Sequence, residues 1–280
     1  MAFPRTTVGG VSLPRMIIGT NWLFGWSHTG HAADSFIKDC YAAEDSFVPI
    51  LGAYLAHGVD AVMGPFSTHP GAADKIHKAQ DILGKKLIII DTPVINVDDT
   101  EQARKTVRDI FKYSAEIGSA FCLIHHSSCE QLVNKNRKTM ERLPQYLEMI
   151  REAGLKPGLS AHMPEVIQYA DLNNYDVETY IQIFNCMGFM MQVEIESVIR
   201  IIHDAKKPVM TIKPMAAGRV TPYVGLTFNW NVLPQNAMVT VGAFSKYEAE
   251  EDVDISLAAL EHRLPRVEGR SSPAAQSIIK

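Results

Sequence analysis

Short runs of hydrophobic residues alternate along the chain with longer segments whose hydrophobic residues recur every three or four positions. The short runs hold four or five residues rich in Ile, Val, Leu and Met, which is typical of strands buried on both faces of a parallel sheet. The longer segments are typical of helices that bury one side, and several of them end near a glycine. The expected strands span residues 15–19, 61–64, 86–90, 120–124, 156–159, 181–184, 208–212 and 237–241. The expected helices span residues 46–57, 70–83, 100–117, 138–153, 164–169, 192–205 and 248–261.

Eight strand–helix units with no break in composition predict a single (β/α)8 TIM barrel, an α/β fold, over residues 1–262. Residues 263–280 are expected to form a loosely packed C-terminal extension. The alternative is an open doubly wound sheet. That fold would favour a glycine-rich phosphate loop after the first strand, where this chain has Gly19, Thr20 and Asn21 instead.

Composition narrows the classes of partner without changing the predicted fold. The chain has 280 residues, of which 46% are hydrophobic, and its net charge is -4, so a large core is possible and a nucleic-acid footprint is not expected. No apolar run approaches the roughly 20 residues that span a bilayer, and Met1–Arg5 is not expected to start a signal peptide. The four cysteines lack metal-ligand pairs, which favours a reducing cytoplasm. We expect a small-molecule substrate, and an oligomer is possible.

The placement of the histidines is the main chemical clue. In TIM barrels the reacting groups follow the carboxyl ends of the strands. Six of the ten histidines fall there, namely His28, His31, His69, His125, His126 and His162. Asp91, His125 and His162 end strands 3, 4 and 5 and predict an open site for Zn, Mn or Fe, to which His28 and His31 would add. His125 and Asp91 are also candidate acid–base residues.

Each of these histidines also has a structural interpretation. His125 and His126 are adjacent, so their side chains are expected on opposite faces of the strand, one of them against the helices. His28 and His31 would then line a surface loop, His69 would cap the second helix, and Asp91 would stabilise a turn.

Other polar and aromatic residues follow the strands. Lys213 ends an apolar strand, where it would bind a substrate anion, form a Schiff base or pair with Asp91. Trp22 and Trp26, with Phe24, would stack on a sugar or another ring, or simply roof the barrel. The candidate substrate-binding residues are Asn21, Trp22, Trp26, His126, Asn185 and Arg219.

The second half of the chain resembles the aldo-keto reductases. The similar segments are LIHH at 123–126, REAGLKPGLSAHMPE at 151–165, QIFN at 182–185, KPV at 207–209 and KPMAAGR at 213–219, and the likeness extends over about residues 118–260. The resemblance implies a TIM barrel, reduction of a carbonyl compound and binding of NAD(P). It implies cofactor contacts from Ser160, Gln182, Gly242 and Ser245.

The first half departs from that family's catalytic pattern. The family has an Asp and a Tyr after strand 2 and a Lys after strand 3, whereas this chain has Gly64, Pro65 and Phe66 after the one and Asp91 after the other. Of the family's four catalytic residues only the histidine is matched, by His125. The chain therefore lacks the tyrosine that donates the proton to the carbonyl in that family.

Three functions follow from these observations. The first is a lyase, isomerase or hydrolase that uses His125, Asp91 and Lys213, with or without a divalent metal, on a small polar or carbohydrate-like substrate. The second is a divergent NAD(P)-dependent reductase with a proton donor recruited from elsewhere, such as Tyr41 or Tyr54. The third is a barrel that binds a metabolite without catalysis.

Overall fold

Eight parallel strands close into one barrel, which confirms the predicted single-domain (β/α)8 fold. The computed structural model describes residues 2–69 and 71–266. Each strand pairs with its neighbour in the chain, and the last strand pairs with the first. All eight lie within two residues of their predicted bounds. In chain order they are β3 (Met16–Gly19), β4 (Ala61–Gly64), β5 (Ile88–Asp91), β6 (Ser119–Ile124), β9 (Lys156–Ala161), β10 (Thr179–Ile183), β11 (Val209–Ile212) and β12 (Met238–Val241).

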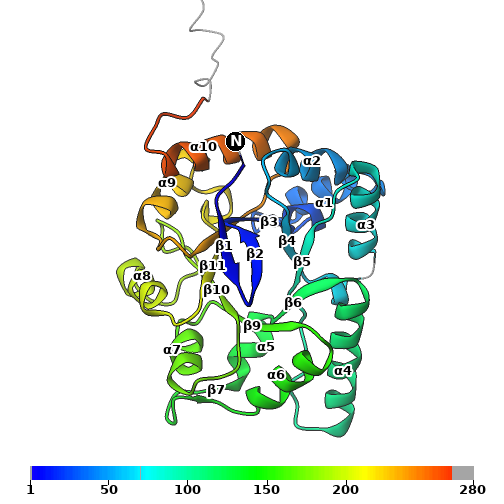
Figure 1. The fold of residues 1–280 in the computed structure, drawn as a ribbon, viewed down its shortest axis with the longest axis vertical. Coiled ribbons are helices and arrows are strands. Elements are labelled where there is room, and N and C mark those ends of the chain that lie inside the picture. Colours follow the sequence, from blue (N-terminus) through cyan, green and yellow to red (C-terminus); the bar gives the residue numbers. More distant parts are fainter. Residues whose placement is uncertain (1, 70, 267–280) are drawn as a thin grey trace, which may run out of the picture.

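Helices surround the barrel and cover its outer face (Figure 1). They are α1 (His31–Cys40), α2 (Val48–Ala56), α3 (Ala72–Leu83), α4 (Glu101–Glu116), α5 (His126–Cys129), α6 (Leu143–Glu152), α7 (Glu165–Leu172), α8 (Ile195–Asp204), α9 (Pro222–Val232) and α10 (Lys246–Leu260). Short 3-10 turns lie at η1 (Trp22–Phe24), η2 (Phe66–Thr68), η3 (Glu130–Leu132) and η4 (Ala216–Gly218).

The strand side chains divide between two apolar layers. Those that point inward, such as Ile17, Ile90 and Phe121, fill the barrel with fully buried contacts. Their neighbours along the strands, such as Ile18 and Ile89, pack against the helices instead. Because both faces are buried, the strands contain continuous apolar runs rather than alternating ones.

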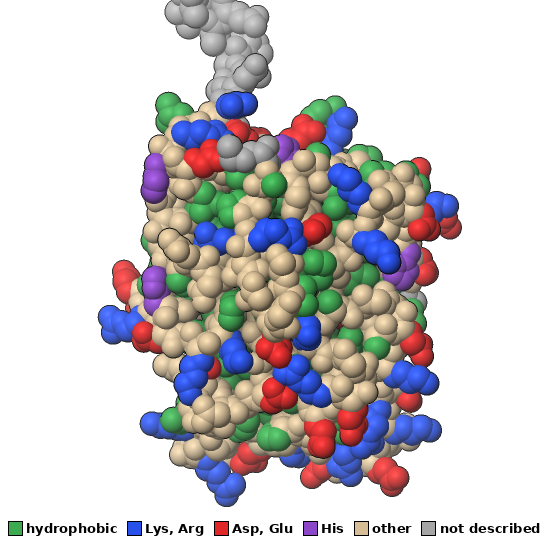
Figure 2. Space-filling view, in the orientation of Figure 1, with side chains coloured by type: hydrophobic (Ala, Val, Ile, Leu, Met, Phe, Trp, Pro, Cys, Tyr) green, Lys and Arg blue, Asp and Glu red, His purple; other side chains and the backbone are tan. Residues whose placement is uncertain are grey.

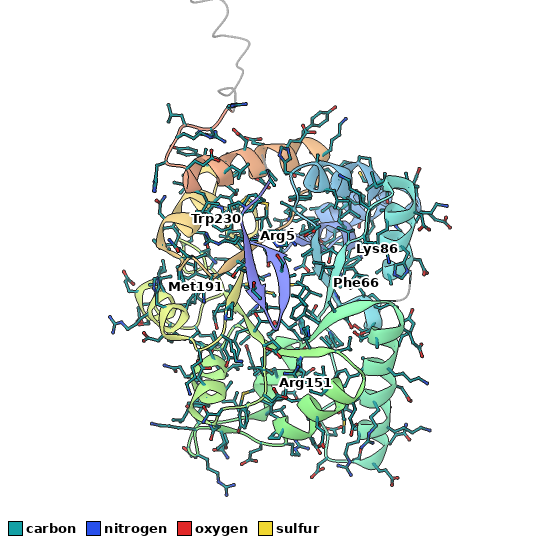
Figure 3. The ribbon with its side chains drawn as sticks, in the orientation of Figure 1. Arg5, Phe66, Lys86, Arg151, Met191 and Trp230 are labelled. Atoms are coloured by element: carbon teal, nitrogen blue, oxygen red, sulfur yellow. The ribbon has the colours of Figure 1, made fainter. Side chains whose placement is uncertain are left out.

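A hairpin closes the barrel at the amino ends of its strands. It consists of β1 (Arg5–Val8) and β2 (Val11–Pro14), and it lies at the centre of the view in Figure 1. Its Val8 and Leu13 join the apolar cluster inside the barrel, and Arg5, labelled in Figure 3, pairs with Asp60 at 2.9 Å. Figure 2 shows acidic and basic side chains interspersed over this face. The open end of the barrel is therefore the opposite one, where the strands end.

Several features differ from the expected elements or were not foreseen. The helix expected from residue 138 begins at Leu143, because the small hairpin β7 (Val133–Asn134) and β8 (Thr139–Met140) precedes it. The hairpin β1–β2 and the helices α1, α5 and α9 were not expected. The start of the expected helix 70–83 and most of the expected extension lie outside the described residues, which exclude 70 and 267–280. Among the described residues no helix is long and apolar enough to cross a membrane.

Candidate active site

A cavity of about 420 Å³ lies at the carboxyl ends of the barrel strands. Its basic lining residues come from five different loops and are His28, His69, His125, His126, His162 and Lys213. No Asp or Glu is among the described residues that line it. A half-buried lysine and five imidazoles without a facing carboxylate give the cavity a positive field when any of them is protonated, and such a cavity favours an anionic ligand.

Three of the histidines form one stack. β6 ends at Ile124, and His125 then caps α5, so the chain has already left the strand where the two adjacent histidines occur. The ring centroids of His125 and His126 lie 4.3 Å apart, and those of His126 and His162 lie 4.0 Å apart with the planes only 11° from parallel. The expectation that His125 and His126 point to opposite faces is therefore wrong, because strand alternation no longer applies to them. Both line the cavity.

Burial keeps the stacked histidines neutral. Loss of solvent lowers the pKa of His162 to about 3 and that of His125 to about 4, and the neighbouring histidines and Lys213 add to both shifts. The pKa of His126 is also lowered by burial, while Glu130 opposes the shift. Each ring therefore meets the cavity as an uncharged imidazole at neutral pH, able to accept or donate a proton.

Hydrogen bonds assign opposite tautomers to two of the rings. The backbone N–H of Ser127 donates to Nδ1 of His125 at 3.3 Å, so neutral His125 carries its proton on Nε2. Nδ1 of His69 lies 3.1 Å from the carbonyl oxygen of Pro65, which can only accept, so His69 carries its proton on Nδ1 and has a free lone pair on Nε2. The cavity thus holds one imidazole set to donate and another set to accept.

Glu130 fixes the backbone that carries the third stacked ring, that of His162. Its Oε1 accepts hydrogen bonds from the backbone N–H groups of His162, at 2.5 Å, and Met163, at 2.8 Å. This fixes the turn that follows β9 and with it the position of the His162 ring. Nε2 of Gln182 donates to the His162 carbonyl at 3.3 Å from the neighbouring strand.

Lys213 is the only lysine among the described residues that line the cavity. It directly follows β11 and has a left-handed backbone conformation, with φ of 60°. Its Nζ lies 2.9 Å from Nε2 of His28, and Nδ2 of Asn21 lies 3.3 Å from the same ring nitrogen. Burial lowers the pKa of Lys213 to about 8. Burial and the positive charge of Lys213 together lower the pKa of His28.

Asp91 does not meet the histidines. Its neighbour Ile90 points into the barrel, so Asp91 faces the helix layer, where it is fully buried and its Oδ1 accepts from the backbone N–H of Ser67 at 3.1 Å. Burial raises the pKa of its carboxyl group. The alternative ion pair between Asp91 and Lys213 does not form, since Lys213 faces the other side of the sheet and lines the cavity.

The expected metal ligands are not arranged as a set. His28, His125 and His162 line the cavity, but Asp91 faces away from it, and exposed His31 begins α1 without lining the cavity. Within residues 2–69 and 71–266, no three His, Cys, Asp or Glu side chains are placed to hold one ion. The residues present therefore do not fit the three-ligand Zn, Mn or Fe site that the sequence predicts.

The remaining candidate residues separate into two groups. Asn21, Trp22, Trp26, Ser160 and Gly242 line the cavity, and the missing side chain of Gly242 leaves room for the Trp22 indole. The others do not line it and have contacts elsewhere: Asn185 closes the turn to Phe189, Arg219 stacks on the Phe189 ring at 4.1 Å, buried Gln182 bonds to the His162 carbonyl, and Ser245 caps α10.

The structure places His69, one of the six histidines expected at the carboxyl ends of the strands, in the wall of the cavity and not at a helix cap. Its ring lies 4.9 Å from that of Trp26, edge to face. Sequence reasoning overlooked the lining residue Met190, which follows no strand directly. Neither Tyr41 nor Tyr54, the proton donors considered for a reductase, is among the described lining residues, which include no tyrosine. Both pack in the layer between barrel and helices.

Comparisons with solved structures show that the fold of nearly the whole chain is similar to that of aldo-keto reductases. No protein-family model matches the chain, and no curated protein sequence does. A protein described as an aldo-keto reductase from Pseudomonas aeruginosa is similar over 91% of this chain and 95% of its own, with a TM-score of 0.64 and 16% identity. Aldose reductase from Giardia lamblia is similar over 95% and 90%, with a TM-score of 0.54 and 12% identity. At these identities the likeness concerns the fold, and the chain is an aldo-keto-reductase-like TIM barrel.

Proposed function

We propose that this chain is an acid–base enzyme, a lyase or isomerase that moves a proton on a small anionic carbonyl compound. The observation that carries the proposal is the convergence of five histidines and Lys213 on one cavity with no carboxylate among the described lining residues. The imidazoles of His125, His126 and His162, held neutral by burial, suit proton transfer, and a lysine beside them suits a carboxylate or phosphate group of the substrate.

The two tautomers divide the roles. Nε2 of His69 has a free lone pair because its Nδ1 proton is bound to the Pro65 carbonyl, so His69 is the candidate base. Nε2 of His125 carries a proton because its Nδ1 accepts from Ser127, so His125 is the candidate acid. A base and an acid with opposite assignments in one pocket match the requirements of an enolisation.

The reaction then proceeds through an enolate or enol. His69 removes a proton from the carbon next to the carbonyl, and the electron pair moves onto the carbonyl oxygen. That oxygen receives a hydrogen bond or the proton from His125, and the Lys213 ammonium stabilises the charge that develops. Return of the proton to a different carbon completes an isomerisation, whereas loss of a group from the next carbon completes a lyase reaction.

The two alternative functions have less support. The reductase alternative needs a proton donor beside the substrate, and no tyrosine is among the described residues that line the cavity. Ser160 and Gly242 remain the lining residues that a nicotinamide cofactor would contact. A barrel that only binds a metabolite would have no need of two histidines with opposed tautomers.

Proton exchange in D2O tests the proposal directly. Proton NMR follows replacement of the C–H hydrogens of pyruvate, dihydroxyacetone phosphate and comparable anionic sugars, each incubated with the protein. We expect exchange or isomerisation with at least one compound and a loss of roughly 100-fold or more in His69→Gln and His125→Gln. His77→Gln is the matched control, because His77 bonds to the Ile117 carbonyl on the outer layer. Equal rates in His69→Gln and His77→Gln, or no exchange in the whole panel, would contradict the proposal.

A further inference from the structure

Lys213 has an environment that suits a nucleophilic amine. It lines the cavity without a facing carboxylate, and its one hydrogen bond among the described residues is with Nε2 of His28, at 2.9 Å. A lysine that only balanced a charge in the fold would be expected to face Asp or Glu, and one that is desolvated among neutral groups is activated instead.

His28 is set to take a proton from this amine. The side-chain amide of Asn21 donates to Nε2 of His28 at 3.3 Å, and an amide nitrogen cannot accept, so Nε2 carries the lone pair. The contact between Lys213 and His28 is then a donation from the amine to the ring. His28 lies at the mouth of the cavity, beside the amine and the space that a substrate would occupy.

The backbone at and after Lys213 is strained. Lys213, Ala216 and Ala217 have φ angles of 60°, 49° and 55°. Residues other than glycine seldom occupy this left-handed region. Three such residues within five positions immediately follow the strand that ends at the cavity. Strain of this kind persists where the surrounding structure holds a functional group in place.

We propose that Lys213 forms a Schiff base with the carbonyl carbon of an anionic aldehyde or ketone, an inference that rests on the proposed function and specifies its covalent step. The Lys213 ammonium first gives one proton to Nε2 of His28, and the neutral amine nitrogen then attacks the carbonyl carbon. One proton of the attacking nitrogen moves to the carbonyl oxygen, and His28 returns its proton to the hydroxyl group that results. Water leaves as the C=N bond forms, so no oxidant or reductant is needed. In the protonated imine the nitrogen of Lys213 replaces the carbonyl oxygen as the electron acceptor. His69 removes the proton from the neighbouring carbon, and the electron pair of the broken C–H bond moves toward this nitrogen.

Reductive trapping tests the covalent step. The protein is incubated with glyoxylate, a small anionic aldehyde, and sodium cyanoborohydride near pH 7.5, and peptide mass spectrometry measures the carboxymethyl adduct on each lysine. We expect Lys213 to be labelled at least about tenfold faster than Lys246, an exposed lysine on α10. We also expect His28→Gln to slow labelling of Lys213 severalfold. Labelling of Lys213 no faster than that of Lys246 in the wild-type protein would overturn the inference.

The two experiments can refute the Schiff base and the proposed function independently of each other. Proton exchange without preferential labelling of Lys213 would leave the proton-transfer function standing and refute the Schiff base. Preferential labelling of Lys213 without exchange in any compound of the panel would support the nucleophile and refute the lyase or isomerase. The labelling ratio of Lys213 to Lys246 is measured in the wild-type protein, so the result does not depend on whether any variant folds.

Discussion

A carboxylate placed beside Lys213 should reverse the property that makes it reactive. His28→Glu puts an acid of similar reach where Nε2 now lies 2.9 Å from Nζ, and His28→Gln is the matched neutral control. Two unit charges 4 Å apart interact by about 4 kcal/mol at an effective dielectric constant of 20, or about three pKa units. Because His28 is exposed at the mouth, solvent screening should reduce this to about one or two units.

Competitive labelling with acetic anhydride at a series of pH values measures the titration of individual lysines by peptide mass spectrometry. In the wild-type protein Lys213 should titrate near its lowered pKa of about 8. His28→Glu should move that midpoint above 9, whereas His28→Gln should leave it within about half a unit. A wild-type midpoint near 10.4, the value of an ordinary lysine, would refute the reasoning, as would equal midpoints in the two variants.

Three further predictions concern stability and metal. The pKa values of His162 and His125, about 3 and 4, lie below those of an unfolded chain, so the unfolded state binds more protons and stability should fall as the pH drops from about 6.5 to 4.5, by roughly 2 kcal/mol for each ring. Urea unfolding at the two pH values measures this loss, and His162→Gln should reduce it. Asp91→Ala should cost about 1–3 kcal/mol in the same assay, because the buried Ser67 N–H loses its acceptor; no change would contradict that contact. Dialysis against a chelator should leave proton exchange unchanged, because Asp91 faces away from the histidines; a stoichiometric metal whose removal abolished exchange would contradict the site as described.

The fold could be predicted because its signal is distributed along the chain. Eight apolar runs flanked by helical patterns predict a barrel even if one run is assigned wrongly. All eight runs form strands. Two of the elements that were missed, α9 and the hairpin β1–β2, carry little periodic signal. α9 has the sequence PYVGLTFNWNV, with apolar residues all around the helix, and the hairpin β1–β2 has strands of only four residues each.

The site was harder to predict because its geometry depends on where each strand stops. The expectation that reacting groups follow the carboxyl ends of the strands correctly brought five of the histidines and Lys213 to one cavity, namely His28, His69, His125, His126 and His162. The expectation failed for Asp91. Side chains alternate along β5, and because Ile90 points into the barrel, Asp91 points outward to the helices. A run of apolar residues does not show which of its positions face inward. Tautomers and pKa values depend on contacts such as that between His69 and the Pro65 carbonyl, which no spacing in the sequence specifies.

The most direct test of the account is nitrogen-15 NMR of the histidine side chains, titrated with pH in the absence and presence of pyruvate. The account predicts that His125 and His162 stay neutral at pH 5.5 in the free protein, with the proton of His125 on Nε2, and that bound pyruvate raises both pKa values, since an anion offsets the charge of Lys213. Histidines that all titrate near pH 6.5 and do not respond to the anion would contradict it.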